Sequence, residues 1–126
     1  MKAGFETIKV YELAYRSAME IFKQSKGFPV EEKYSLTDQV RRSSRSVCAN
    51  VAEAYRKRRY LKHYVMKLTD ADSEASETVV WLNFAKDCGY ITQDCFDPLS
   101  SSYGEIGSLL GFMIDHPEKF GVPRPI

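Results

Sequence analysis

The sequence predicts an all-α protein, an antiparallel, up-and-down four-helix bundle. Three observations lead to this prediction. Apolar residues recur every three or four positions in four long segments, no segment alternates apolar and polar residues as a strand would, and the breaks between segments are short. Helices joined by short connections pack against their neighbours in opposite directions, and this buries their apolar faces in one core.

The first two helices are separated by a loop that contains Gly27 and Pro29. Pro29 disfavours helix at the residue before it, and Gly27 suits a helix C-terminus. Ser35 or Thr37 can cap the second helix, whose apolar residues lie within a narrow arc. All four helices are expected in a single domain that covers residues 1–126, with approximate bounds 7–26, 35–59, 60–88 and 93–115.

The third helix has the clearest period, because its apolar residues from Leu61 to Leu82 step by three and four until Gly89 ends the pattern. The fourth helix begins at Thr92 or at Asp97, the latter with proline in its first turn, and a proline ends it. The tail covers residues 117–126, and its last stretch, from Phe120 to Ile126, contains two prolines and is predicted to be extended or loose.

The composition is that of a soluble globular protein, with 44% hydrophobic and 28% charged residues in 126. No apolar run approaches the ~18 residues of a membrane span, and the N-terminus lacks the apolar region of a secretory signal. A cytoplasmic protein without a membrane partner is therefore expected. Cys48, Cys88 and Cys95 have no Cys-x-x-Cys spacing, so we expect reduced thiols, most of them packed. No metal site, cofactor or small-molecule substrate is predicted.

The second helix carries a basic stripe in a chain whose net charge is only +1. Residues 41–62 contain eight Lys or Arg and one acidic residue. At about 100° per residue, four of the arginines fall within about 60° of one another, and small residues separate them. The candidate binding or interface residues are Arg41, Arg42, Arg45, Arg56, Arg58, Arg59 and Lys62.

Three interpretations of this stripe remain open. In the first interpretation, the stripe is a solvent-exposed face, and the cations at its end complement the negative C-terminus of the helix dipole. In the second, it is an interface, in which the stripe of one subunit meets the acidic turns of another at Asp70, Asp72, Glu74 and Glu77. In the third, it binds nucleic acid, with arginines on phosphates and Tyr55, Tyr60 and Tyr64 stacked on unpaired bases.

The fourth helix carries Gly104, Gly107 and Gly111 at small-residue spacing. Each glycine costs a helix about 1 kcal/mol relative to alanine. That cost is compatible with close packing against another backbone, and equally with a loose, irregular helix. The first of these alternatives favours a homo-oligomer.

The segment from Tyr34 to Tyr55 resembles a family signature. It contains Leu36-Thr-Asp-Gln-Val-Arg-Arg42 and Val47-Cys-Ala-Asn-Val-Ala-Glu-Ala54. The small four-helix-bundle proteins encoded within 23S rRNA intervening sequences typically read leucine, threonine, a few residues, Gln-Ile-Arg-Arg, then Ile-Pro-Ala-Asn-Ile-Ala-Glu-Gly. The first helix, its following loop and the exit of the third helix are similar to that family as well. Cys48 replaces the usual proline, and Ala54 replaces the usual glycine.

The resemblance implies a bundle that assembles as a ring, commonly a pentamer, with a suspected role on RNA or DNA. A similar architecture occurs in the accessory variability proteins of diversity-generating retroelements, which resemble basic barrels that engage reverse transcriptase and nucleic acid. The family motif places its arginine pair on Arg41 and Arg42, its asparagine on Asn50 and its glutamate on Glu53.

Asn50 and Glu53 lie at the flank of the apolar arc, where a structural hydrogen-bonding role is expected. Arg58 and His63 have an Arg-x4-His spacing that weakly resembles the ribonuclease motif of helical HEPN families, with Arg59 in place of the usual polar residue. We nevertheless predict a protein without catalysis, which interacts with itself and with nucleic acid or a nucleic-acid-processing partner. The alternatives are an oligomer without a nucleic-acid role and a HEPN-like ribonuclease.

Overall fold

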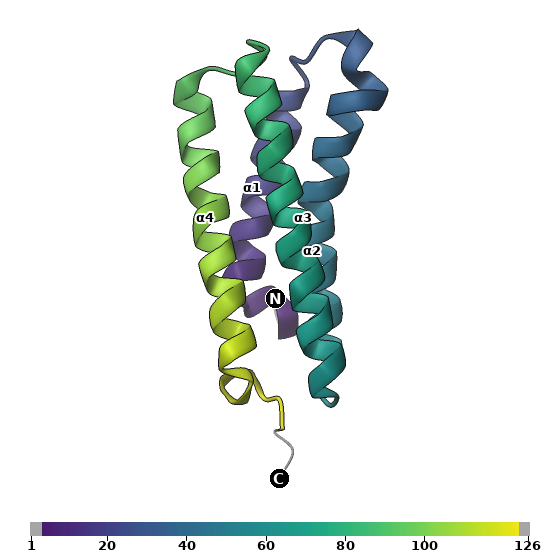
Figure 1. Ribbon diagram of the computed structural model, residues 1–126, viewed down its shortest axis with the longest axis vertical. Helices are drawn as coiled ribbons and strands as arrows, with labels where there is room; N and C mark the ends of the chain where they lie inside the picture. The colour runs from purple at the N-terminus through teal and green to yellow at the C-terminus, as the bar shows by residue number, and fades with distance from the viewer. Residues whose placement is uncertain (1–3, 124–126) are drawn as a thin grey trace.

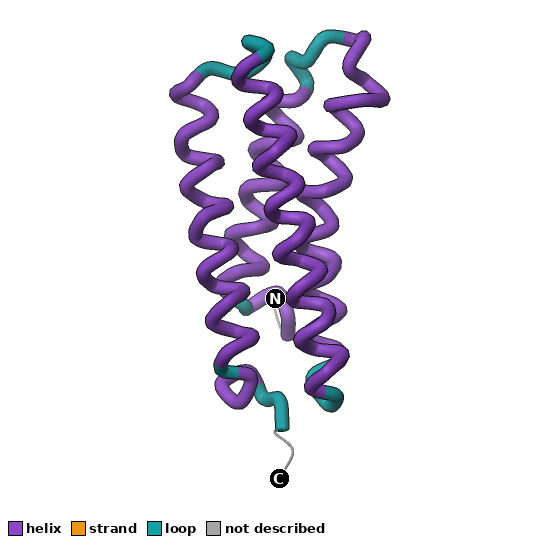
Figure 2. Tube along the Cα trace, in the orientation of Figure 1, coloured by secondary structure: helices purple, strands orange, loops and turns teal. Residues whose placement is uncertain are grey.

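The computed structural model describes residues 4–123, and within this range it contains four long helices and no strand (Figures 1 and 2). The helices are α1 (Lys9–Ser25), α2 (Asp38–Arg56), α3 (Leu61–Asp87) and α4 (Gln93–Asp115). Short helical turns occur at Gly4–Thr7, Val30–Glu32, Lys33–Thr37 and Pro117–Phe120. The predicted all-α fold class is confirmed for the described residues.

The four helices lie side by side along the long axis of the molecule (Figure 1). α1 packs against α2 and α4, and α3 packs against the same two helices. Their apolar faces form one core, in which Ile21, Val47, Leu68 and Leu110 are almost fully buried. No helix within residues 4–123 is both long enough and apolar enough to span a bilayer.

The second helix differs from its predicted bounds at both ends. Lys33–Thr37 forms a π-helical turn that leads directly into α2, so neither Ser35 nor Thr37 acts as a side-chain cap. The Ser35 hydroxyl instead donates to the Glu32 carboxylate over 2.6 Å. α2 then ends at Arg56, and Arg59 lies in the turn before α3 rather than on the helix.

The other helices lie within two residues of their predicted bounds, and α4 has the bounds 93–115 that were predicted. The Thr92 hydroxyl accepts a hydrogen bond from the Cys95 amide over 3.2 Å, which caps α4 at its first turn. Pro98 therefore lies in the second turn of α4, where it cannot donate the helical hydrogen bond to the Asp94 carbonyl.

The segment after α4 is folded back onto the bundle rather than loose as far as the structure describes it. Pro117–Phe120 forms a 3₁₀ turn, and Val122 is buried in the core. Residues 124–126 of the predicted tail lie outside the described range.

Candidate nucleic-acid interface

Arg41 and Arg45 leave α2 toward α1, where both pack over the ring of Phe22. Their guanidinium carbons lie 4.9 and 5.7 Å from the ring centroid. Lys26 of α1 approaches the same ring at 4.7 Å. The Arg41 Nε also donates to the Ser25 hydroxyl over 2.7 Å. This part of the predicted stripe is therefore a well-defined cluster at the α1–α2 groove.

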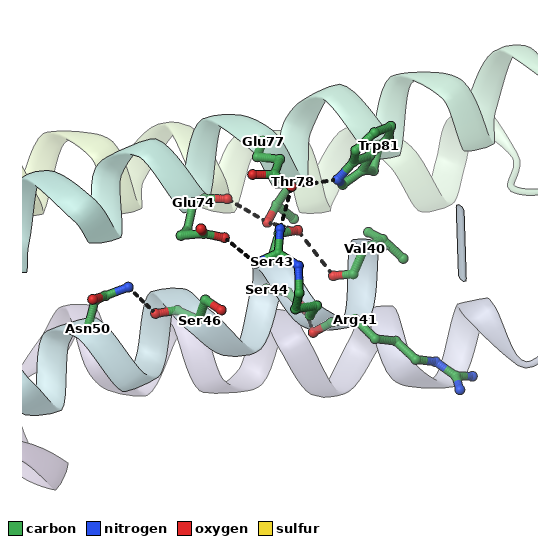
Figure 3. A network of polar contacts seen from close by, with 11 residues as sticks. Val40, Arg41, Ser43, Ser44, Ser46, Asn50, Glu74, Glu77, Thr78 and Trp81 are labelled. Carbon is green, nitrogen blue, oxygen red and sulfur yellow. Dashed lines mark hydrogen bonds and ion pairs between the residues drawn. The ribbon is translucent and has the colours of Figure 1, made fainter. Parts of the chain in front are cut away.

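Arg42 does not belong to that cluster, because it lies on the opposite flank of α2. Its Nη2 is 2.6 Å from the Glu77 carboxylate of α3, and its Nη1 is 3.4 Å from Glu74. Figure 3 shows Glu74 and Glu77 on α3, with Arg41 pointing away from that helix. Glu77 also accepts from the Trp81 indole over 3.3 Å. Two of the four acidic residues expected to meet another subunit are thus engaged within the chain.

Arg58 has a structural role that the sequence did not indicate. Its guanidinium stacks on Tyr55 at 3.7 Å and donates to the main-chain carbonyls of Tyr55 and Phe120, at 2.9 and 3.2 Å. The second of these bonds joins the α2–α3 turn to the segment after α4. Because its Nε and Nη1 groups already donate to these carbonyls, Arg58 does not belong to the candidate binding surface.

The remaining predicted cations are exposed. Arg56 is in the last turn of α2, Arg59 in the turn that follows, and Lys62 in the first turn of α3. Within residues 4–123, none of them forms an ion pair with a carboxylate. We therefore define the basic surface of the protein as Arg41, Arg45, Arg56, Arg59 and Lys62.

The tyrosines expected to stack on bases fall into three different environments. Tyr64 is fully buried, with its hydroxyl 3.5 Å from the Met113 carbonyl, so it belongs to the core. Tyr55 is covered by Arg58 and packs edge-on against Phe5. Tyr60 is exposed and packs edge-on against His63. Tyr15 of α1, which was not among the predicted residues, is also exposed, and its ring stacks on Tyr11.

Asn50 and Glu53 take different partners. The Asn50 amide donates to the Ser46 carbonyl within α2 over 2.9 Å (Figure 3). The Glu53 carboxylate pairs with Lys67 of α3 over 2.7 Å, and this contact raises the pKa of Lys67. Glu53 thus bonds across a helix interface, whereas Asn50 bonds within its own helix.

A cluster of buried polar side chains lies between α2, α3 and α4. The Thr78 hydroxyl is 2.8 Å from both the Ser43 hydroxyl and the Glu74 carbonyl (Figure 3). Tyr103 of α4 is buried nearby, and its hydroxyl makes no hydrogen bond of ordinary geometry within the described part of the chain. Burial raises the pKa of Tyr103 well above its usual range, so this phenol stays neutral.

The glycines of α4 make no close approach to another helix of the same chain. A β-carbon on Gly104 or Gly111 would meet nothing within 4 Å, and one on Gly107 would lie 3.8 Å from the Asp72 carboxylate. Close packing against a neighbouring helix within the subunit therefore does not explain their spacing. Among residues 4–123, no group of three or more His, Cys, Asp or Glu side chains is arranged to hold a metal ion.

These features define a small all-α protein of four helices. Within residues 4–123, cations without an ion-paired carboxylate lie on α2, on the turn after it and at the start of α3. The chain belongs to the 23S rRNA-intervening sequence protein family, whose model matches residues 6–111. It is also similar to a protein of unknown function from the S23 ribosomal protein family of Bacteroides thetaiotaomicron VPI-5482, with 29% identity and a TM-score of 0.76 over 84% of this chain and 95% of that one. No curated protein matches the sequence. The predicted family membership is confirmed.

Proposed function

We propose that this protein is a non-catalytic, homo-oligomeric helical bundle that binds the phosphate backbone of RNA or DNA through its basic surface. The observation that carries this proposal is that all five cations of that surface lack an ion-paired carboxylate within residues 4–123. Cations without an acidic partner can bind phosphates and release the counterions condensed on a nucleic acid, which drives association.

The near-neutral net charge of +1 is low for a nucleic-acid-binding monomer. Assembly offsets this weakness, because identical subunits repeat the basic surface and add avidity. We therefore propose an antiparallel, up-and-down bundle that assembles into a ring, and the family resemblance favours a pentamer. Exposed apolar side chains such as Tyr34 and Phe84, at 77% and 54% exposure, support the presence of a subunit contact.

Binding is tested by fluorescence anisotropy with labelled RNA and DNA at several salt concentrations. The wild type should bind, and its affinity should fall steeply as salt rises. The double variant Arg56→Gln, Arg59→Gln should lower both the affinity and the salt slope, the latter by about 1 to 2 in log–log units. The matched control is Lys9→Gln, Lys33→Gln, which removes the same charge from two exposed positions outside the basic surface.

An oligomer without a nucleic-acid role is the second candidate. The observation that favours it is an apolar groove of about 230 Å³ between the start of α2 and the end of α3, lined by Leu36, Trp81 and Phe84. Light scattering after size exclusion measures the assembly state of wild type and Phe84→Asp. An oligomer that persists while no nucleic acid binds at low salt would favour this candidate, and a monomer at all concentrations would contradict the ring.

The HEPN-like ribonuclease alternative is not favoured by the geometry of its proposed arginine. Arg58 donates to two main-chain carbonyls and covers Tyr55, whereas a catalytic arginine must reach a substrate phosphate. RNA incubated with wild type and His63→Ala tests the alternative. Cleavage by the wild type that is lost in the variant, with binding retained, would overturn the non-catalytic proposal.

A further inference from the structure

Three cations gather around one aromatic ring at the contact between α1 and α2. Lys26, Arg41 and Arg45 surround the Phe22 ring, with their charged groups 4.7, 4.9 and 5.7 Å from its centroid. No carboxylate pairs with any of the three in the described part of the chain. The ring attracts each cation, but it does not neutralise them, and their mutual repulsion remains. An anion placed among them would remove that repulsion.

Two of these cations are held in position before any ligand arrives. Arg41 donates its Nε to Ser25, whose hydroxyl lies 3.0 Å from the Phe22 carbonyl and whose residue is 3% exposed. This bond leaves the terminal Nη groups of Arg41 for another acceptor. Arg45 follows one turn later on α2 and rests on the same ring. Guanidinium groups fixed in this way lose less entropy on binding, and their fork geometry matches phosphate oxygens.

The same flank of α1 carries an exposed aromatic platform. Tyr15 is 52% exposed and stacks on Tyr11, with ring centroids 6.1 Å apart and an interplanar angle of 29°. It precedes Phe22 by seven residues, which is about 10 Å along a helix and returns to the same side. The Tyr15 ring therefore lies on the same flank of α1 as the cations around Phe22.

The charge on this flank of α1 differs between its two ends. The hollow beside Tyr11 and Tyr15 is lined by two carboxylates and one cation, Glu6, Glu12 and Arg16. Around Phe22 there are three cations, and none of them forms an ion pair with a carboxylate within residues 4–123. Phosphate binding is therefore favoured at the Phe22 end, and an uncharged base is tolerated at the Tyr15 end.

We propose that the groove between α1 and α2 binds single-stranded nucleic acid, with a phosphate among Lys26, Arg41 and Arg45 and a neighbouring base stacked on Tyr15. This inference rests on the proposed function and specifies its substrate class. A base can stack on a protein ring only when it is unpaired, whereas phosphate contacts alone do not distinguish single strands from duplexes.

The test compares a labelled oligouridylate with an RNA duplex of the same length, at one fixed salt concentration. Tyr15→Leu should weaken single-strand binding about ten-fold and leave duplex binding unchanged, whereas Tyr15→Phe should retain it because the ring remains. Arg41→Gln, Arg45→Gln should weaken single-strand binding and lower its salt slope by about 1. Tyr34→Leu is the matched control for the ring, because Tyr34 is another exposed tyrosine. The variant Arg59→Gln, Lys62→Gln is a comparison and not a neutral control, because it removes two other cations of the basic surface and should weaken single-strand and duplex binding alike. Circular dichroism confirms that each variant is folded.

Two results would overturn the inference. If single-strand binding is insensitive to Tyr15→Leu and to the Arg41, Arg45 pair but is lost in the Arg59, Lys62 pair, the groove is not the site, although the proposed function stands. Equal losses for single strand and duplex in Tyr15→Leu would exclude base stacking. If the wild type binds neither probe even at low salt, the proposed function itself fails, and the inference fails with it.

Discussion

The Arg42 guanidinium of α2 lies 2.6 Å from the Glu77 carboxylate of α3, on the flank of α2 opposite to Arg41. Two adjacent arginines in the chain thus serve different contacts. Arg42 joins two helices of the chain, α2 and α3, while Arg41 faces α1. This division separates the arginine pair of the family motif into a structural member and a candidate binding member.

Arg42→Gln should therefore affect stability more than nucleic-acid binding. Its side chain is 50% exposed, and that of Glu77 is 35% exposed, so solvent screens the pair and the expected loss is only about 0.5 kcal/mol. Urea unfolding measures the stability, and anisotropy measures the salt slope, which should equal that of the wild type. A slope that falls as much as in Arg41→Gln would show that both arginines contact phosphate.

Arg58→Lys should destabilise the protein by about 2 kcal/mol, because a lysine cannot reproduce the two main-chain hydrogen bonds and the stacking on Tyr55. Gly121→Ala should also be destabilising, by about 1 kcal/mol. Gly121 has a φ of 79°, and an added β-carbon would lie 3.0 Å from the Arg58 Nη1. Urea unfolding of both variants checks this. If the free energy of unfolding of Arg58→Lys equalled that of the wild type, the contact with the segment after α4 would contribute little to stability.

Tyr103→Phe should leave the protein equally stable or stabilise it by up to about 1 kcal/mol, because it removes a buried hydroxyl that has no hydrogen-bond partner among residues 4–123. Thr78→Val is the matched control. It deletes a buried hydroxyl that bonds to Ser43 and the Glu74 carbonyl, and it should destabilise the fold. Thermal unfolding distinguishes the two. A clear loss of stability in Tyr103→Phe would reveal a hydrogen bond to that phenol.

The loop between α1 and α2 should lose stability at acidic pH. Glu32 accepts hydrogen bonds from Ser35 and Tyr90, at 2.6 and 2.8 Å, and these bonds lower the pKa of Glu32. A lowered pKa in the folded state means that the stabilisation is complete above the ordinary carboxyl range and is lost as the pH falls through the lowered value. The same contact raises the pKa of Tyr90 to about 12, so the phenol remains protonated at neutral pH.

Glu32→Gln should therefore reduce the acid sensitivity of unfolding, and Tyr90→Phe should reduce it partly because the Ser35 bond remains. Hydrogen exchange of the amides from Val30 to Thr37, followed between neutral and acidic pH, reports on this loop directly. The same acid-induced loosening in Glu32→Gln as in wild type would assign the effect to another carboxylate.

The three thiols should react at different rates. Burial raises the pKa of Cys48 to about 11, so almost no thiolate forms at neutral pH, whereas Cys88 is exposed after the end of α3. Iodoacetamide followed by mass spectrometry should modify Cys88 first and Cys48 only after unfolding. Early alkylation of Cys48 would indicate local opening of the α1–α2 groove.

Helical periodicity was sufficient to predict the four helices, because each buries one continuous face and that face must repeat every three or four residues. The prediction for α4 was the most accurate, since Thr92 caps the helix and Pro117 begins the turn that follows it. The start of α2 was less predictable. Lys33–Thr37 forms a π turn that runs directly into α2, and the Ser35 hydroxyl bonds to Glu32 of the loop rather than capping the helix.

The candidate site was predictable only in part. The sequence placed Arg41, Arg42 and Arg45 on one side of a helix but could not assign their partners, which come from α1 and α3. Phe22 and Lys26 were missed because residues far away in the chain give them their role. Helical spacing within α1 does place Tyr15 and Phe22 on a common flank, and this was the available signal.

The sequence by itself determined the all-α class, the approximate helices and the family, because these depend on local periodicity and on a contiguous motif. Only the tertiary structure decided which cations are free. Arg42 and Arg58 look like their neighbours in the sequence, yet α3 supplies carboxylates to one, and the segment after α4 supplies a carbonyl to the other. The charge that a residue offers to a ligand depends on what faces it across the helix interface, and the chain's local pattern does not contain that information.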